Sequence, residues 1–156
     1  MKAASLSEIK HELHDKSKLE LLELCTQLSR FKKENKELLT YLLFESHDES
    51  AYIQGIGMEL EKSFSEINTD SYYYIKKSVR KILRRIKTYI RYSKKKETEI
   101  ELLILFCRQL KNMKPSYAKN VSLINLYNRQ LSLIEKALLS LHEDLQYDYK
   151  MVLDEL

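Results

Sequence analysis

Hydrophobic residues recur every three or four positions along most of the chain, with charged residues between them. This spacing places apolar side chains on one face of an α-helix. No window alternates apolar and polar residues over the length of a strand with turn signals at both ends. The chain has only two Gly and one Pro, a composition that disfavours loop-rich and β-rich folds. The pattern therefore predicts an all-α protein.

Three Ser-x-x-Glu sequences mark predicted helix starts, at Ser5, Ser17 and Ser46. In this pattern the Ser side chain accepts a hydrogen bond from an early backbone N–H, and the Glu side chain accepts one from the Ser N–H. Together with the apolar spacing, these starts predict helices over about 5–14, 18–31, 34–45, 48–67, 71–93 and 97–113. A last helix is predicted from about 116–121 to about 153, with a bend near His142.

A single domain is predicted over residues 1–156, because no linker rich in Gly, Pro or Ser interrupts the helical pattern. Short connections make sequential helices antiparallel neighbours. The expected architecture is an antiparallel bundle of six or seven helices or a short α-α superhelix, between which periodicity does not decide. Its core is expected to centre on the last helix and on the apolar face of the helix over 71–93.

The last helix carries a second signal, a heptad-like 3-4-3-4 spacing of apolar residues. Its members are Ile124, Tyr127, Leu131, Ile134, Leu138, Leu141 and Leu145. One interpretation is that this helix is the central helix of its own bundle. The other is a homodimer interface, and a broad apolar face is compatible with both.

Positive charge is concentrated in residues 72–96, which hold eleven Lys and Arg and no Asp or Glu in a chain of net charge +4. Residues 1–70 carry a net charge of −5 and residues 97–156 a net charge of −2. A helical projection gathers Ile75, Val79, Ile82, Leu83, Ile86, Tyr89 and Ile90 on one side. The opposite side is uniformly basic. Like charges at i,i+4 destabilise a helix, so some opposite charge is expected to offset them.

This basic face is the best functional candidate in the sequence. The predicted anion- or partner-binding residues are Lys76, Lys77, Arg80, Lys81, Arg84, Lys87, Arg91 and Lys94, with Tyr73 and Tyr92 beside them. Basic side chains bind phosphates, and tyrosines stack on bases or sugars. The pattern therefore favours a non-enzymatic binding or scaffolding protein with a polyanionic partner, either nucleic acid or an acidic or phosphorylated protein.

An alternative interpretation is structural, with the basic face neutralised inside the protein. The helix predicted over 48–67 and the start of the one over 97–113 supply the acids for this. They are Asp48, Glu49, Glu59, Glu61, Glu66, Glu97, Glu99 and Glu101. In that case the chain is a structural or protein-interaction helical protein.

Enzymatic and metal chemistry find little support in the sequence, and no cofactor, metal or catalytic residue is predicted. Glu8 and His11 have the i,i+3 spacing of di-iron bundles, but the second Glu-x-x-His pair is missing. Cys25 and Cys107 each fall in an apolar helical stripe, which favours reduced core thiols over the alternative of a disulfide. Gly55, four residues after Ala51, suggests a close helix–helix crossing.

No membrane span or secretory signal is expected. The longest apolar run is Leu102–Cys107, far shorter than the roughly 20 residues that span a bilayer. The N-terminal segment becomes charged before an apolar signal region can form. These features favour a cytoplasmic protein without a membrane partner.

Three stretches resemble a family of small, uncharacterised, all-helical bacterial proteins that is classified only as a domain of unknown function. They are "LLELCTQLSRFKKENKELLTYLLF", "EINTDSYYYIKKSVRKILRRIKTYIRYSKKKETEIELL" and "LHEDLQYDY". The resemblance implies a bacterial cytoplasmic helical protein and supplies no activity or site residues. "LSEIKHELHDKSKLELLEL" is also similar to two-helix DNA-binding modules with L-x-x-L-K spacing, although it lacks their glycine turn.

Overall fold

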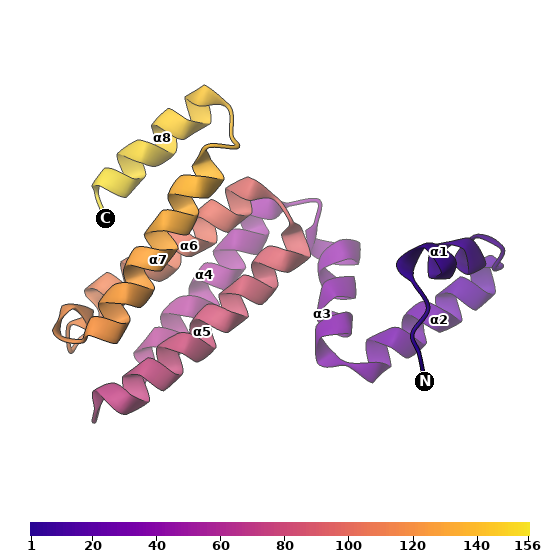
Figure 1. Cartoon of the computed structure of the whole chain (residues 1–156), viewed down its shortest axis with the longest axis horizontal. Coiled ribbons are helices and arrows are strands. Elements are labelled where there is room, and N and C mark those ends of the chain that lie inside the picture. The colour runs from indigo at the N-terminus through magenta and orange to yellow at the C-terminus, as the bar shows by residue number, and fades with distance from the viewer. The chain divides into compact units, whose positions relative to one another are not determined.

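The computed structural model describes residues 1–156 and contains helices without any strand (Figure 1). The all-α prediction is confirmed. The helices are α1 (Leu6–His14), α2 (Lys18–Phe31), α3 (Lys33–Thr40), α4 (Glu49–Ser65), α5 (Tyr72–Ser93), α6 (Lys96–Asn112), α7 (Val121–Leu138) and α8 (Glu143–Asp154). A π-helical turn at Tyr41–Glu45 follows α3, and a 3₁₀ turn at Tyr117–Lys119 precedes α7.

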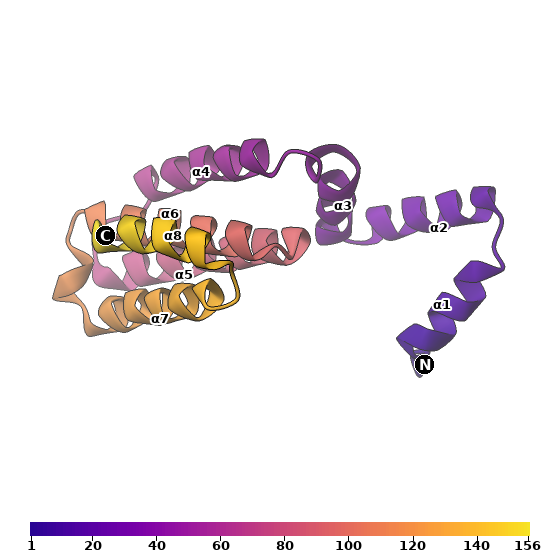
Figure 2. The same cartoon turned by 90° about the horizontal axis from the view of Figure 1, so that it is seen from above.

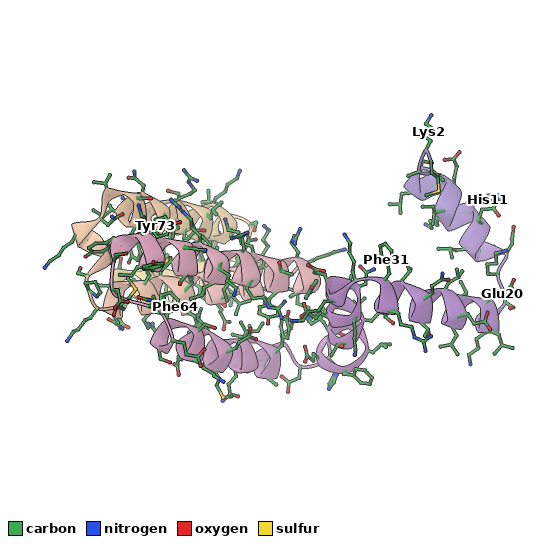
Figure 3. The ribbon with its side chains drawn as sticks, turned by 90° about the horizontal axis from the view of Figure 1, so that it is seen from below. Lys2, His11, Glu20, Phe31, Phe64 and Tyr73 are labelled. Carbon is green, nitrogen blue, oxygen red and sulfur yellow. The ribbon has the colours of Figure 1, made fainter.

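The chain divides into two compact units, Met1–Phe44 and Glu45–Leu156. The single domain over 1–156 stays a prediction. In the first unit α2 packs against α3, yet none of α1, α2 and α3 contains a buried residue. Phe31, labelled on α2 in Figure 3, is 77% exposed. The physical reason for the division is that the apolar stripes of these short helices bury no side chain in a common core.

The second unit is a helical bundle. Helices α4, α5, α6 and α7 alternate in direction, and α8 turns back after α7 (Figures 1 and 2). Apolar side chains from all four long helices are buried between them, and Phe64 and Phe106 meet edge-on with ring centroids 5.7 Å apart. The antiparallel arrangement of neighbouring helices agrees with the prediction from short connections.

The centre of the bundle is α6, so the expectation that the last helix is central was wrong. Helix α6 contacts α4, α5 and α7. Its buried residues are Thr98, Ile100, Leu102, Leu103, Ile104, Phe106, Cys107 and Leu110. They cover most of the helix circumference, as expected for a helix packed on several sides. The uninterrupted apolar run Leu102–Cys107 is the sequence signal of this burial.

The last helix is divided rather than bent. Helix α7 ends at Leu138, and His142 caps α8 by accepting a hydrogen bond from the Asp144 N–H at 3.4 Å. The buried stripe of α7 is Leu123, Tyr127, Gln130, Ile134, Ala137 and Leu138. Three members of the predicted heptad series, Tyr127, Ile134 and Leu138, are therefore buried within the bundle. The homodimer stays a prediction.

The predicted capping boxes are confirmed at two of three places. Ser5 with Glu8 and Ser17 with Glu20 exchange both hydrogen bonds of the motif, and these bonds lower the pKa of Glu8 and of Glu20. The third box was wrong, because Asp48 is the N-cap of α4. The carboxylate of the predicted third partner, Glu49, instead lies 3.2 Å from the Lys95 ammonium.

The two cysteines differ in their environments. Cys107 is buried in α6, and burial raises the pKa of its thiol to about 12. Cys25 is exposed on α2, so its assignment to the core was wrong. Cys25 lies in the apolar stripe of α2, but no residue of α2 is buried, and the thiol stays exposed. Only Cys107 fits the inert core thiol that the sequence predicted.

The close helix crossing predicted at Gly55 is also wrong. A Cβ atom built on Gly55 would meet no atom within 4 Å. This glycine lies inside α4 without packing or backbone need for it.

Gly55→Ala is therefore expected to stabilise the bundle by about 0.5–1 kcal/mol, since alanine in an open helix interior costs less conformational entropy than glycine. Thermal or urea unfolding followed by circular dichroism measures the change. A lower midpoint would show that this glycine is required in a way that the open space around it does not reveal.

Candidate polyanion-binding groove

Helix α5 is amphipathic in the way its sequence predicted. Ile75, Val79, Leu83, Ile86 and Tyr89 are buried on its inner side. Ile82 and Ile90, also assigned to that side, are half-buried. The helix is thus anchored by its apolar stripe, and its basic residues occupy the remaining circumference.

Internal acids neutralise only a small part of the positive charge of residues 72–96. Arg85 lies 3.7 Å from Glu59, Lys95 pairs with Glu49, and Lys96 pairs with Glu99. No carboxylate lies within 4.0 Å of the remaining eight basic side chains. They are Lys76, Lys77, Arg80, Lys81, Arg84, Lys87, Arg91 and Lys94, the eight cations that the sequence assigned to the binding face.

Arg85 differs from its neighbours because it has a place in the packing of α4 on α5. Its guanidinium lies 4.4 Å from the centroid of the Tyr89 ring. The Tyr89 hydroxyl donates to Glu59 at 2.6 Å, and burial together with this hydrogen bond raises the pKa of Tyr89. The Glu59–Arg85–Tyr89 cluster is therefore part of the bundle and does not belong to the free basic face.

The free cations form a row along α5. Spacings of four and three residues align Lys77, Arg80, Arg84, Lys87 and Arg91 on one side of the helix. All are exposed except Lys87, which is half-buried. Lys76 is half-buried and Lys81 is exposed beside the row. Lys94 lies just past the helix, where its left-handed backbone (φ 60°) forms the C-cap.

The two tyrosines assigned to the basic face differ in their exposure to solvent. Tyr73, labelled near the start of α5 in Figure 3, is 67% exposed and meets Tyr74 edge-on with ring centroids 5.4 Å apart. It continues the basic row one turn before Lys77. Tyr92 is only 8% exposed and meets the Tyr89 ring at 6.3 Å. Because Tyr92 packs in the core, it is not available to stack on a ligand and we leave it out of the face.

A groove of about 730 Å³ runs between α5 and α7, which both pack on α6. Its α5 wall contains Arg80, Leu83, Arg84 and Lys87. Its α7 wall contains Val121, Ser122, Asn125, Leu126, Arg129 and Gln130. Four cations and no acid line this groove, so it is strongly electropositive with an apolar component. We call it the α5–α7 groove.

The register of the two helices places cations along the whole groove. At one end the Arg80 guanidinium donates to the Ser122 hydroxyl at 2.9 Å. Helices α5 and α7 run in the same direction, because each alternates with α6 (Figure 1). Seven residues further along each helix, about 10.5 Å, are Lys87 and Arg129. The two walls therefore contribute opposed cations at the other end.

The sequence pattern missed Arg129 and Gln130. Arg129 is a single cation in a helix whose apolar spacing was its main signal. Gln130 is the one polar residue in the buried stripe of α7 and is 1% exposed. The sequence does contain a signal for Gln130, because this polar residue occupies one position of the otherwise apolar series Leu123, Tyr127, Gln130 and Ile134, spaced by four, three and four residues. Only the packing of α7 beside α5 joins these residues to the basic row.

The hollow between α7 and α8 does not share the uniform positive charge of the α5–α7 groove. A hollow of about 500 Å³ between α7 and α8 is lined by acids and lysines alike, Glu135 and Asp154 with Lys136 and Lys150. No three His, Cys, Asp or Glu side chains are grouped so as to hold a metal ion. None of the helices combines the length and hydrophobicity needed to cross a membrane.

Comparisons with protein-family models, curated proteins and solved structures find no match to the chain. The candidate site therefore rests on its residues and their geometry. The class that the fold and the groove define is an all-α bundle with an unneutralised basic groove.

Proposed function

We propose that this protein is a non-enzymatic binding or scaffolding protein that holds a polyanion, single-stranded nucleic acid in particular, along the basic row of α5 and in the α5–α7 groove. It acts in the cytoplasm without a cofactor or metal. The observation that carries the proposal is the absence of internal neutralisation. Eight cations of residues 72–96 have no carboxylate within 4.0 Å, and like charges at helical spacing repel one another. A bound polyanion would relieve this repulsion.

The shape of the surface favours an extended single strand. From Tyr73 to Arg91 the row spans 18 residue steps along the helix, or about 27 Å. The exposed rings of Tyr73 and Tyr74 lie at the start of the row. In the groove, Leu83 and Leu126 add apolar surface. Proteins that bind single strands combine such a cationic path with surfaces on which bases stack.

An acidic or phosphorylated protein segment is the second candidate, because unpaired arginines also bind carboxylates and phosphates. The same eight cations support it. Apolar contact surface and exposed tyrosines at the groove and row favour bases and sugars over a glutamate-rich peptide, so nucleic acid is placed first.

The test is a fluorescence-anisotropy titration of the whole protein with labelled single-stranded oligonucleotides and with a poly-glutamate peptide, at several salt concentrations. For four phosphates held by the groove cations, log K is expected to fall with log salt with a slope of about −3. Binding of poly-glutamate alone would favour the protein-partner candidate. No binding of either polymer at the lowest salt would contradict the proposal.

A further inference from the structure

The buried side chain of Gln130 has an unused hydrogen-bond acceptor in the wall of the α5–α7 groove. Its Nε2 donates to the Leu126 carbonyl oxygen at 2.9 Å, within α7. Its Oε1 is buried and accepts no hydrogen bond. Buried polar atoms are almost always paired, since an unpaired one has lost water without replacement. Gln130 therefore lacks a donor for this oxygen, and the residue lines the α5–α7 groove.

The groove around Gln130 does not supply that donor itself. Arg80 is engaged with Ser122, and Arg84, Lys87 and Arg129 make no hydrogen bond to Oε1. A phosphate group cannot supply it either, because a phosphodiester at neutral pH has only acceptor oxygens. A ligand that satisfies both the cations and Gln130 must carry a hydroxyl or N–H close to its phosphates.

RNA meets this requirement with a group that DNA lacks, because each ribose has a 2′-hydroxyl beside the phosphodiester, whereas the N–H donors of DNA lie on the bases and not on the sugar–phosphate backbone. The 2′-hydroxyl is the group by which proteins distinguish the two polymers. We propose that the α5–α7 groove selects RNA over DNA, with a ribose 2′-hydroxyl donating to Gln130 Oε1 while the neighbouring phosphates contact the groove cations. This inference rests on the proposed polyanion binding and specifies its ligand.

The test compares three oligonucleotides of one uridine-rich sequence on the whole protein at one salt concentration. They are RNA, its deoxyuridine counterpart and 2′-fluoro RNA, which keeps a ribose-like sugar pucker but has no hydroxyl donor. RNA is expected to bind about 2- to 10-fold more tightly than DNA, the range of one net hydrogen bond. The 2′-fluoro RNA is expected to bind like DNA.

Gln130→Met removes the acceptor while keeping an unbranched side chain of similar length. The variant is expected to lose the preference, so that it binds RNA and DNA with equal affinity. A variant that keeps the RNA preference would overturn the inference. If the variant does not fold, the 2′-fluoro comparison on the wild type decides.

The outcomes separate this inference from the proposed function. Equal binding of RNA and DNA, or 2′-fluoro RNA binding as tightly as RNA, overturns the role of Gln130 and leaves polyanion binding in place. Binding of none of the three oligonucleotides removes the proposed nucleic-acid function and the inference with it.

Discussion

A variant with Arg80, Arg84, Lys87 and Arg129 all changed to Gln is expected to bind a single-stranded oligonucleotide at least about 100-fold more weakly than the wild type at low salt. Hydrogen bonds to charged groups are worth about 1.5–3 kcal/mol each, and each 1.4 kcal/mol is tenfold in affinity. Loss of two such contacts already accounts for the expected change. The measurement is the anisotropy titration with one oligonucleotide.

The fold of this variant is expected to survive. Arg84 and Arg129 are exposed and Lys87 is half-buried, and none of them has an acid partner in the groove wall. Relief of like-charge repulsion along α5 is expected to leave stability unchanged or raise it slightly. A clear loss of stability would instead indicate that these cations are neutralised structurally.

A second variant, with four other lysines changed to Gln and the same loss of charge, is the control for the effect of net charge on affinity. Lys10, Lys16, Lys18 and Lys36 are exposed lysines of the Met1–Phe44 unit, and changing them to Gln is expected to leave affinity close to that of the wild type. An equal loss in both variants would show that binding follows overall charge, and the groove would have no special role.

Phe106→Ala is the second change with a large expected effect, a loss of about 3–5 kcal/mol in the free energy of unfolding. Phe106 is 0% exposed in the central helix α6 and packs edge-on against Phe64. Its removal takes away buried apolar area and leaves a cavity that the surrounding helices fill only in part. Urea unfolding followed by circular dichroism measures the change.

Phe31→Ala is the matched control, the same substitution at an exposed phenylalanine of α2. It is expected to change stability by no more than about 0.5 kcal/mol, as for most surface substitutions. Equal effects at Phe106 and Phe31 would contradict the assignment of α6 as the bundle's centre and of α2 as a helix without a core.

Local features of this fold could be predicted from the sequence because they depend on residues a few positions apart. The Ser5 and Ser17 capping boxes and the core side of α5 are examples. The capping box predicted at Ser46 has the same motif but was wrong. Asp48 lies closer to the start of α4, and its side chain accepts the capping hydrogen bond from the Ala51 N–H. Two caps compete there, and the pattern alone does not rank them.

Features that depend on which helices pack together could not be predicted. Tyr92 and Arg85 follow basic residues in the sequence, yet both are engaged by the bundle, through Tyr89 and Glu59. Arg129 and Gln130 lie more than 30 positions from the basic row and join it only because α5 and α7 share α6 as a neighbour. The basic face was visible in the sequence, whereas the groove required the packing.

The most direct test of the groove is the salt dependence of binding by Arg129→Gln. Arg129 belongs to α7 and enters the site only if the ligand lies between α5 and α7. The slope of log K against log salt is expected to become shallower by about 0.7–1, the contribution of one phosphate contact. Lys136→Gln is the control, because Lys136 is an exposed cation of α7 that lines another hollow, and it should leave the slope unchanged. A slope for Arg129→Gln equal to that of the wild type would show that the ligand does not occupy the α5–α7 groove.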